Sequence, residues 1–417
     1  MNRTAVGVVV AALTVLGTGG GAAAQNLLIT NARILDGAGG VIERGSIAVV
    51  DGRIAAVGAM AAEPAGAVRI DAGGKTVMPG LIDAHRHIIQ GDPARWLDEQ
   101  SAASMQAFLD AGFTTVFSAI DATAEIVELR RRIAAGEVGG PRLLAAGFVP
   151  LAAAMPGGGA PGVDPARTDA SRGPRPAQAP AISEEQTRAT VRALAAAGVD
   201  AIKTVLITTD NGPEQATLGV VVDEARRAGI PTVTHAVTVR DTVAAVEAGT
   251  TMLVHTPHIG QLDTATARMI ASAGIPMTST LGVFVPFFNA ENEPLFRDFG
   301  PFPWDTLSSA GQGPVNARLL FEEGITYAYG TDTSYSPRDS LAHELKPLSL
   351  VFSPRDIVPI LTRNAAIAIG LGDETGTLEA GKLGDLVMID GDPLEDIYDV
   401  LEVELVVKEG RIVADKR

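Results

Sequence analysis

Four histidines, a lysine and an aspartate are spaced along the chain in a way that could bind metal ions. His85 and His87 stand two residues apart in the segment TVMPGLIDAHRH. Side chains alternate between the two faces of a strand, so both imidazoles would point the same way and could bind one ion. A lone histidine is more often a buried structural residue, but this pair after a Pro-Gly step favours a metal site.

The other candidates follow glycines that end helical segments. Lys203 lies five residues after Gly198, His235 six after Gly229, His255 six after Gly249 and Asp332 eight after Gly324. This similar distance places each candidate at or just past the carboxyl end of a strand. Enzymes built on α/β barrels do their chemistry at that end.

The elements that must position these residues repeat one pattern, which is an Ala-rich helical segment, a glycine and then an apolar strand. Six glycines mark the pattern, namely Gly112, Gly198, Gly229, Gly249, Gly274 and Gly324. The strands in TVMPGLIDAHRH and PRLLAAGFVP bring the number of strands to eight. Eight strands that alternate with helices predict an α/β fold of the TIM-type (β/α)8 barrel class.

Lys203 is the least expected candidate, because VDAIKTVLI is an apolar strand in which an unpaired ammonium would be costly to bury. Desolvation lowers the pKa of a lysine, and a neutral amine can add carbon dioxide to form a carbamate that bridges two metals. The alternative is a lysine paired with a buried acid.

Asp332, in YAYGTDTS, could bind a metal and also take a proton from the water on that metal. Taken alone it could equally be a turn or cap residue. Its place after the eighth strand favours the catalytic role. His258, three residues after His255, could reach the substrate or could only support a loop.

Three weaker candidates for substrate contact are Arg142, Phe284 and Tyr335. Arg142 could instead pair with a surface acid, and the aromatic stretch that starts at Phe284 suits a substrate pocket, a subunit contact or core. The Gly- and Pro-rich segment 156–180 could be a linker or an active-site lid. His343, in an expected helix, is interpreted as structural.

Short strands separated by turns occur at both ends of the chain. SIAVVDGRIAAVG near the start contains Asp51-Gly52-Arg53-Ile54, and ELVVKEGRIVADKR at the end contains the similar Glu409-Gly410-Arg411-Ile412. We therefore expect one small composite β-sandwich from residues 25–78 and 371–417, with the barrel at residues 79–370.

Residues 1–24 have the pattern of a signal peptide, with Arg3, an apolar run and small residues before Gln25. The apolar run is shorter than the roughly 20 residues that cross a bilayer, and no other stretch is suited to span one. The sequence therefore predicts a periplasmic or secreted protein without a stable membrane span.

The composition limits the classes of partner. The 417 residues carry a net charge of -16, which argues against a nucleic-acid surface, because phosphate binding depends on clustered Lys and Arg. A small-molecule substrate and a homo-oligomeric state are expected. The chain has no cysteine, so thiolate ligands and disulfides are excluded and stability must come from packing or metal.

With these residues in view, the chain resembles the amidohydrolase superfamily from Leu27 to about Val413. The resemblance rests on the metal-competent residues and on the segments VMPGLIDAHRH, TRNAAIAIGL and GTLEAGKLGDLVMIDGDP. It implies a distorted barrel with a composite β-sandwich. Within the superfamily the chain looks most like the branch of imidazolonepropionase-like proteins, Xaa-Pro dipeptidases and ochratoxinase-type amidases.

The resemblance also implies two divalent metal ions, with zinc expected. His85, His87 and Asp332 would bind the first metal and His235 and His255 the second, with carbamylated Lys203 and a hydroxide between them. One departure concerns the loop after the third strand, where relatives often carry a histidine and this chain reads AAAMPGGGAPG. Substrate recognition on that side is therefore open.

The reaction that the resemblance implies is hydrolysis of an amide bond by metal-bound hydroxide, with Asp332 as the proton shuttle. The substrate would be an N-acyl amino acid, a dipeptide or an ochratoxin-like amide. A cyclic amide, a lactone, a carbamate or a phosphotriester is the alternative at the same site. A non-catalytic barrel scaffold is disfavoured because the ligand set is intact.

Overall fold

The computed structural model describes residues 25–153, 181–260, 262–284 and 304–417. The expected signal peptide at residues 1–24 and the segment 156–180, expected as linker or lid, lie outside these ranges. Within the described ranges, no helix has both the length and the apolar character that crossing a membrane requires.

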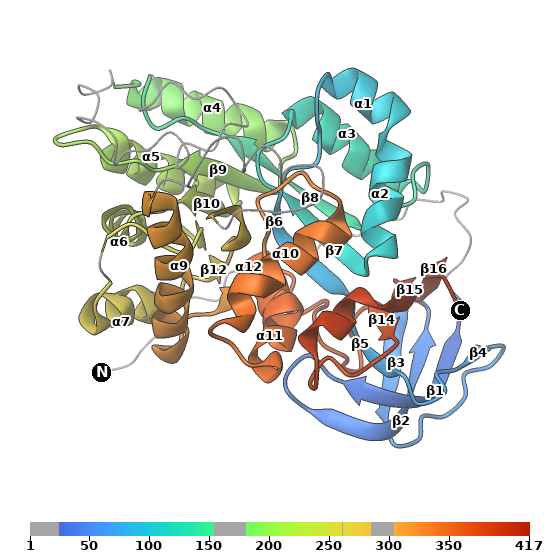
Figure 1. Ribbon diagram of the computed structural model, residues 1–417. Coiled ribbons are helices and arrows are strands. Elements are labelled where there is room, and N and C mark those ends of the chain that lie inside the picture. The colour runs from blue at the N-terminus through green and yellow to red at the C-terminus, as the bar shows by residue number, and fades with distance from the viewer. Residues whose placement is uncertain (1–24, 154–180, 261, 285–303) are drawn as a thin grey trace, which may run out of the picture.

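Eight parallel strands form the barrel sheet, and they are paired in the order of the sequence (Figure 1). They are β6 Leu81–Arg86, β7 Phe113–Ser118, β8 Arg142–Phe148, β9 Ala201–Val205, β10 Thr232–His235, β11 Met252–Val254, β12 Met277–Thr278 and β13 Tyr327–Ala328. The end of β13 returns to β6, because the Ala84 amide donates to the Tyr329 carbonyl at 3.1 Å. The predicted eight-stranded barrel is confirmed, and it is nearly closed.

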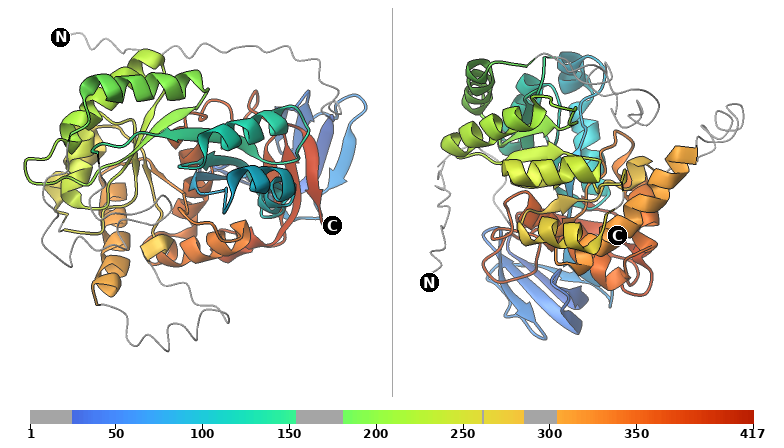
Figure 2. Two further views of the ribbon diagram at one scale, coloured as in Figure 1. Left: turned by 90° about the horizontal axis from the view of Figure 1, so that it is seen from above. Right: turned by 90° about the vertical axis from the view of Figure 1, so that its left-hand side faces the viewer.

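Helices surround these strands on the outside (Figure 2). Their bounds are α1 Pro93–Glu99, α2 Ser101–Asp110, α3 Thr123–Ala134, α4 Glu184–Ala196, α5 Glu214–Ala228, α6 Val239–Ala248, α7 Thr264–Ser272, α9 Trp304–Glu322, α10 Pro337–Ser349, α11 Pro354–Leu361 and α12 Arg363–Ala368. Short 3-10 turns lie at η1 Gly282–Phe284 and η2 Ile397–Leu401.

Two of the glycines that were predicted to end helices do so in the structure. Gly229 ends α5 with φ 74° and Gly249 ends α6 with φ 82°, and both are left-handed caps. A side chain would strain this backbone conformation, so glycine lets each helix end and the chain turn directly into the next strand.

Strands from both ends of the chain build the second sheet. They are β1 Leu27–Leu35, β2 Val41–Val50, β3 Arg53–Gly58, β4 Val68–Asp71, β5 Thr76–Pro79, β14 Leu386–Ile389, β15 Val403–Lys408 and β16 Arg411–Asp415. The order is β16-β15-β14-β5-β1-β2-β3, with β4 paired to β1, and Figure 1 shows the red and blue strands side by side. The predicted composite domain is confirmed as one mixed sheet.

The expected single strand TVMPGLIDAHRH is two strands in two sheets. β5 pairs antiparallel with β14 in the terminal sheet, and β6 starts the barrel after Gly80. A side chain at Gly80 would collide with Thr114, so only glycine allows the chain to pass so close to β7. This glycine is the joint between the two sheets.

The barrel interior below the polar end is filled by a small apolar cluster. Its buried members include Ile82, Ala84, Phe117, Ala146, Ala201, Val233, Met252, Val254 and Ala328. Most of these side chains are small or branched, as a chain with only 4% aromatic residues requires. These side chains pack directly beneath the charged residues at the carboxyl end of the barrel.

Arg142 lies at the opposite end of the barrel from the predicted site, which corrects its interpretation as a substrate contact. It is the first residue of β8, and its Nη1 atom donates to the fully buried Asp385 at 2.8 Å and to Thr115 at 3.0 Å. Its Nη2 atom donates to Glu409 at 2.6 Å. Arg142 therefore connects the barrel to the terminal sheet.

We predict that Arg142→Met lowers the free energy of unfolding by about 3–5 kcal/mol, because it leaves the Asp385 carboxylate buried without its cation. The matched control is Arg53→Met, which removes a half-exposed pair with Glu374 and should cost about 0–1 kcal/mol. Urea unfolding of both variants measures the difference. Equal losses would mean that the junction does not depend on this pair.

Candidate active site

Five of the predicted metal ligands meet at the carboxyl end of the barrel around one carboxylate. The Nε2 atoms of His85 and His87 lie 3.0 and 2.9 Å from Asp332 Oδ1. His255 Nε2 lies 3.9 Å from Asp332 Oδ2 and 2.6 Å from His235 Nδ1. The residues lie on β6 and β10 or one to four residues after β6, β11 and β13, so neighbouring and opposite strands converge there.

Lys203 extends from β9, the fourth barrel strand, into the same region. Its side chain is buried, and among the described residues its Nζ atom has no hydrogen-bond partner. Burial lowers the pKa of this amine to about 7. The structure therefore holds a buried amine of which a substantial fraction is neutral at pH 7.

The imidazoles of His85, His235 and His255 are also neutral. Burial lowers the pKa of His85 and of His235 to about 3, with the charge of Lys203 as a second cause. Burial and the neighbouring His235 hold the pKa of His255 well below its usual value. The His85–Asp332 contact is therefore no ion pair at pH 7. Neutral imidazole is the form that binds metal.

Asp332 remains ionised although it is buried. Burial alone would raise its pKa, but the surrounding His85 and His255 and the hydrogen bonds it accepts hold the pKa well below the ordinary value. One ligand atom each from His85, His255 and Asp332 lies within 4.8 Å of the others. Neutral nitrogen donors around a carboxylate fit a divalent cation, and the absence of thiols leaves nitrogen and oxygen as the donor atoms.

Backbone hydrogen bonds fix the Asp332 segment onto β6. The amides of Thr331 and Asp332 both donate to the His85 carbonyl, at 3.1 and 2.8 Å. At Gly330 a Cβ atom would lie 2.9 Å from His85 Cβ, so the segment can approach β6 this closely only with glycine there. Asp332 itself has φ 54°, a region that Asp tolerates better than most side chains.

Asp83 is a site residue that the sequence reasoning missed. Its Oδ1 atom accepts from the His85 amide at 3.1 Å, and its Oδ2 atom accepts from Thr331 Oγ1 at 2.7 Å. Burial raises its pKa to about 6. Asp83 thereby ties the strand with the first histidines to the segment with Asp332. The sequence feature that could have identified Asp83 is the presence of an acidic residue within the apolar run GLIDAHRH.

Asp121 and Thr280 position two of the histidine segments and were also missed. Asp121 accepts from the amides of Ile88 and Ile89 at 3.0 and 2.9 Å, which holds the chain just after His87. Thr280 Oγ1 lies 2.6 Å from His255 Nδ1. Thr280 follows Gly274 by six residues, so the spacing that indicated His235 and His255 applies to it as well.

Glu344 is a buried carboxyl group behind the site. It accepts from the amides of Leu281 and Gly282, which lead to Phe284. The Phe284 ring packs 5.9 Å from the His255 ring and 3.7 Å from the His258 ring, measured between centroids. Burial raises the pKa of Glu344 to about 8. The predicted residue Phe284 therefore does lie at the cluster.

His258 and Tyr335 are near the cluster but differ in exposure. His258 is buried, its Nδ1 atom lies 3.3 Å from the Thr256 carbonyl, and burial lowers its pKa to about 4. Tyr335 is 49% exposed and lines a cavity beside His87. His343 Nε2 lies 2.9 Å from the Gly282 carbonyl, which agrees with the structural role expected for it.

A sequence profile of the Amidohydrolase family matches residues 76–413. An imidazolonepropionase of Methylobacterium sp. (strain 4-46) is 30% identical over 391 residues, which cover 86% of this chain and 91% of that protein. The imidazolonepropionase of Mesorhizobium japonicum is 27% identical over 407 residues, covering 86% and 90%. The match to the imidazolonepropionase of Shouchella clausii is local, at 37% identity over 24% of each chain.

Solved structures share the fold. A Xaa-Pro dipeptidase with bound methionine in the active site superposes with a TM-score of 0.74 at 22% identity, covering 93% of this chain and 99% of that one. Ochratoxinase from A. niger superposes with a TM-score of 0.73 at 21% identity, covering 94% and 96%. Both superpositions extend over more than nine-tenths of this chain.

We predict that Glu344→Gln changes how stability depends on pH. Because the pKa of about 8 in the folded protein exceeds the usual 4.5, only the unfolded chain releases this proton between these values. The group therefore makes folding less favourable by about 1.4 kcal/mol for each pH unit between about 5 and 8.

Denaturation of chelator-treated protein from pH 5 to 8 should show Glu344→Gln gaining stability relative to the unsubstituted protein as the pH rises. The matched control is Glu322→Gln, whose side chain is solvent-exposed on α9 and should give a parallel curve. A parallel curve for Glu344→Gln as well would contradict the raised pKa.

Proposed function

This chain belongs to the amidohydrolase family and is a hydrolase that acts on carbon–nitrogen bonds, and on that premise we propose that it cleaves an amide bond at a site for two divalent metal ions. One observation carries the proposal. The amine of Lys203 is buried, without a partner among the described residues, in the same region as neutral imidazoles and one ionised aspartate. A purely structural lysine in such a place would need an acid beside it.

The histidines divide into two sets that suit two ions. His85 and His87 both contact the same oxygen of Asp332, which supports these three residues as ligands of one ion. His235 and His255 contact each other at 2.6 Å, which supports them as ligands of the other. Zinc suits a donor set of imidazole nitrogen and carboxylate oxygen.

Lys203 is the residue that we propose as a ligand to both ions. Its neutral amine would attack carbon dioxide, forming a new N–C bond and releasing one proton, and the product is a carbamate anion with two oxygens. This change converts a buried group that repels cations into one that binds them. The lowered pKa of Lys203 supports it, because only the neutral amine reacts in this way.

Divalent ions bound here would make water more acidic and polarise the carbonyl of the scissile bond. Asp332 contributes the acid–base chemistry. Its depressed pKa means that it is ionised at the start, so its carboxylate can accept the proton of the attacking water. The same residue then donates that proton to the departing nitrogen, which leaves as a neutral amine.

The substrate class that we propose is an N-acyl amino acid, a dipeptide or an ochratoxin-like amide. The names of the dipeptidase and ochratoxinase neighbours support such substrates. A cyclic amide, a lactone, a carbamate or a phosphotriester would be the alternative. We also propose that residues 1–24 direct export to the periplasm or beyond, and that the protein forms a homo-oligomer.

We predict that the purified protein contains two zinc ions per chain and hydrolyses N-acyl amino acids or Xaa-Pro dipeptides. Asp332→Asn should lower kcat by about 100- to 10,000-fold, since it removes the proton acceptor. Metal analysis and a screen that includes lactones and carbamates test this. Activity confined to lactones, or full activity in Asp332→Asn, would overturn the proposal.

We further predict that Lys203→Ala loses bound metal together with activity, and that added propionate partly restores both by supplying a carboxylate in place of the carbamate. Lys416→Ala, at an exposed position, serves as the control and should keep its metal. Metal content and turnover are measured with and without propionate. Retention of both ions in Lys203→Ala would remove the carbamate from the proposal.

A further inference from the structure

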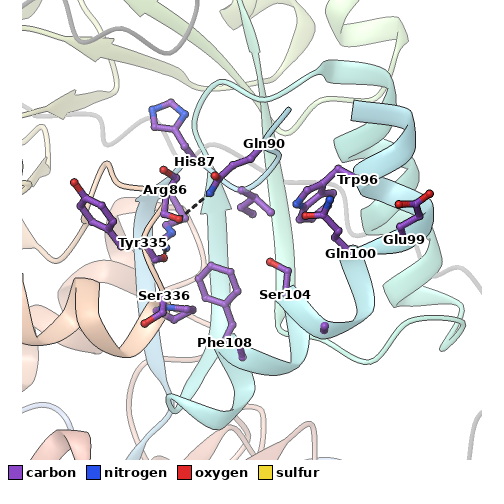
Figure 3. A pocket seen from close by; sticks show the side chains of 15 residues that line it. Arg86, His87, Gln90, Trp96, Glu99, Gln100, Ser104, Phe108, Tyr335 and Ser336 are labelled. Carbon is purple, nitrogen blue, oxygen red and sulfur yellow. Dashed lines mark hydrogen bonds between the residues drawn. The ribbon is translucent and has the colours of Figure 1, made fainter. Parts of the chain in front are cut away.

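A cavity of about 440 Å³ lies beside His87, on the side formed by α1, α2 and the segment before α10 (Figure 3). Its wall includes Arg86, Trp96, Ser104, Phe108 and Tyr335. His87 is the one predicted metal ligand in this wall. The cavity therefore adjoins the metal cluster without containing its other members.

Arg86 brings a buried positive charge to this wall. The side chain is only 2% exposed, and a guanidinium does not lose its proton in proteins. Its Nη1 atom donates to Thr331 Oγ1 at 3.0 Å and to Thr333 Oγ1 at 2.9 Å, and its Nη2 atom donates to the Tyr335 carbonyl. All of these acceptors are uncharged, so they satisfy hydrogen bonds without forming an ion pair.

Among the described residues, Arg86 forms no ion pair, and its buried Nε–H group has no acceptor. Asp83, Asp121 and Asp332 act on it only through longer-range attraction. Asp83 and Asp332 are engaged with the His85 segment and the histidines. A buried cation is costly unless an anion compensates it, so an anionic group in the cavity would be favoured.

The remaining wall suits an apolar body attached to that anion. The Phe108 ring lies 5.2 Å from Arg86 Cζ, and Trp96 is buried on the opposite side of the cavity. Gln90, Gln100 and Ser104 add neutral polar atoms. The acid in the wall, Glu99, is bound by Arg95 at 2.8 Å, which limits its repulsion of a bound anion.

We propose that this cavity binds the carboxylate-bearing, apolar or aromatic portion of the substrate. The proposal rests on the proposed function for the role of the bound group, because His87 would join the cavity to the scissile amide. It defines the substrate as an acid whose carboxylate is neutralised by Arg86 and whose side chain packs between Trp96 and Phe108. A neutral amide of the same shape would lack the charge that Arg86 requires.

Trp96 provides a readout that does not depend on turnover. The chain has two tryptophans, so Trp304→Phe leaves Trp96 as the single fluorescent indole. Metal-loaded protein of this variant is titrated with 3-phenylpropanoate and with the neutral isostere 3-phenylpropanamide. The acid should change the Trp96 emission saturably and bind at least about tenfold more tightly, which corresponds to about 1.4 kcal/mol. Equal affinity for the two compounds would overturn the charge recognition.

Arg86→Met also removes hydrogen bonds that hold the Asp332 segment, so it could unfold the site. A more specific pair of variants, one test and one control, lies on α2. Ser104→Phe fills the cavity and should weaken 3-phenylpropanoate binding at least tenfold, whereas Ala102→Phe, on the exposed side of the same helix, should leave it within twofold. Equal affinity in both variants would overturn the location.

The two proposals fail in different ways. Selective 3-phenylpropanoate binding without hydrolysis of any amide would keep the cavity assignment and reject the amidase function. Amide hydrolysis by a protein whose Trp96 does not distinguish the acid from its amide would keep the function and reject the cavity assignment.

Discussion

The removal of water from an amine and several imidazoles around a single carboxylate is the constraint on which this structure depends. Lys203, His85, His235 and His255 are all buried at one end of the barrel, and Asp332 is the carboxylate among them. Burial favours the neutral form of these nitrogen atoms, so their lone pairs lie beside the negative charge of Asp332. A divalent cation bound here would offset the cost of burying these groups, so metal binding at this site would be thermodynamically linked to folding.

The acidic residues around this cluster hold it in place mainly by accepting hydrogen bonds from backbone amides. Contacts with the side chains of the cluster contribute less. Asp83 binds an amide and a hydroxyl, Asp121 binds two amides, and Glu344 binds two amides. Asp83 and Asp121 thus fix the segments next to His85 and His87, and Glu344 fixes the segment that follows Thr280, the partner of His255. Segments held in this way would present ligands from five strands to an ion with little loss of entropy.

The sequence allowed the barrel and the ligand positions to be predicted because both follow local rules. Glycine stops and apolar strands recur at nearly constant spacing, so the position of His235 after Gly229 also locates the end of β10. The break at Gly80 and the pairing of Arg142 with Asp385 could not be predicted. They depend on β7 and on a residue just before β14, 243 positions away from Arg142. The charge of Arg86 was visible, but the lack of an ion-pair partner for it within the described ranges is a property of three-dimensional packing.

The joint at Gly80 has a consequence for the order in which the protein can be completed. β6, which carries the first histidines, continues directly from β5, and β5 lies between β1 and β14. β14 begins at Leu386, far along the chain from β5, so β5 keeps an unpaired edge until that distant segment has been synthesised. β6 therefore becomes fully anchored only after β14 is present, which delays completion of the candidate site until then.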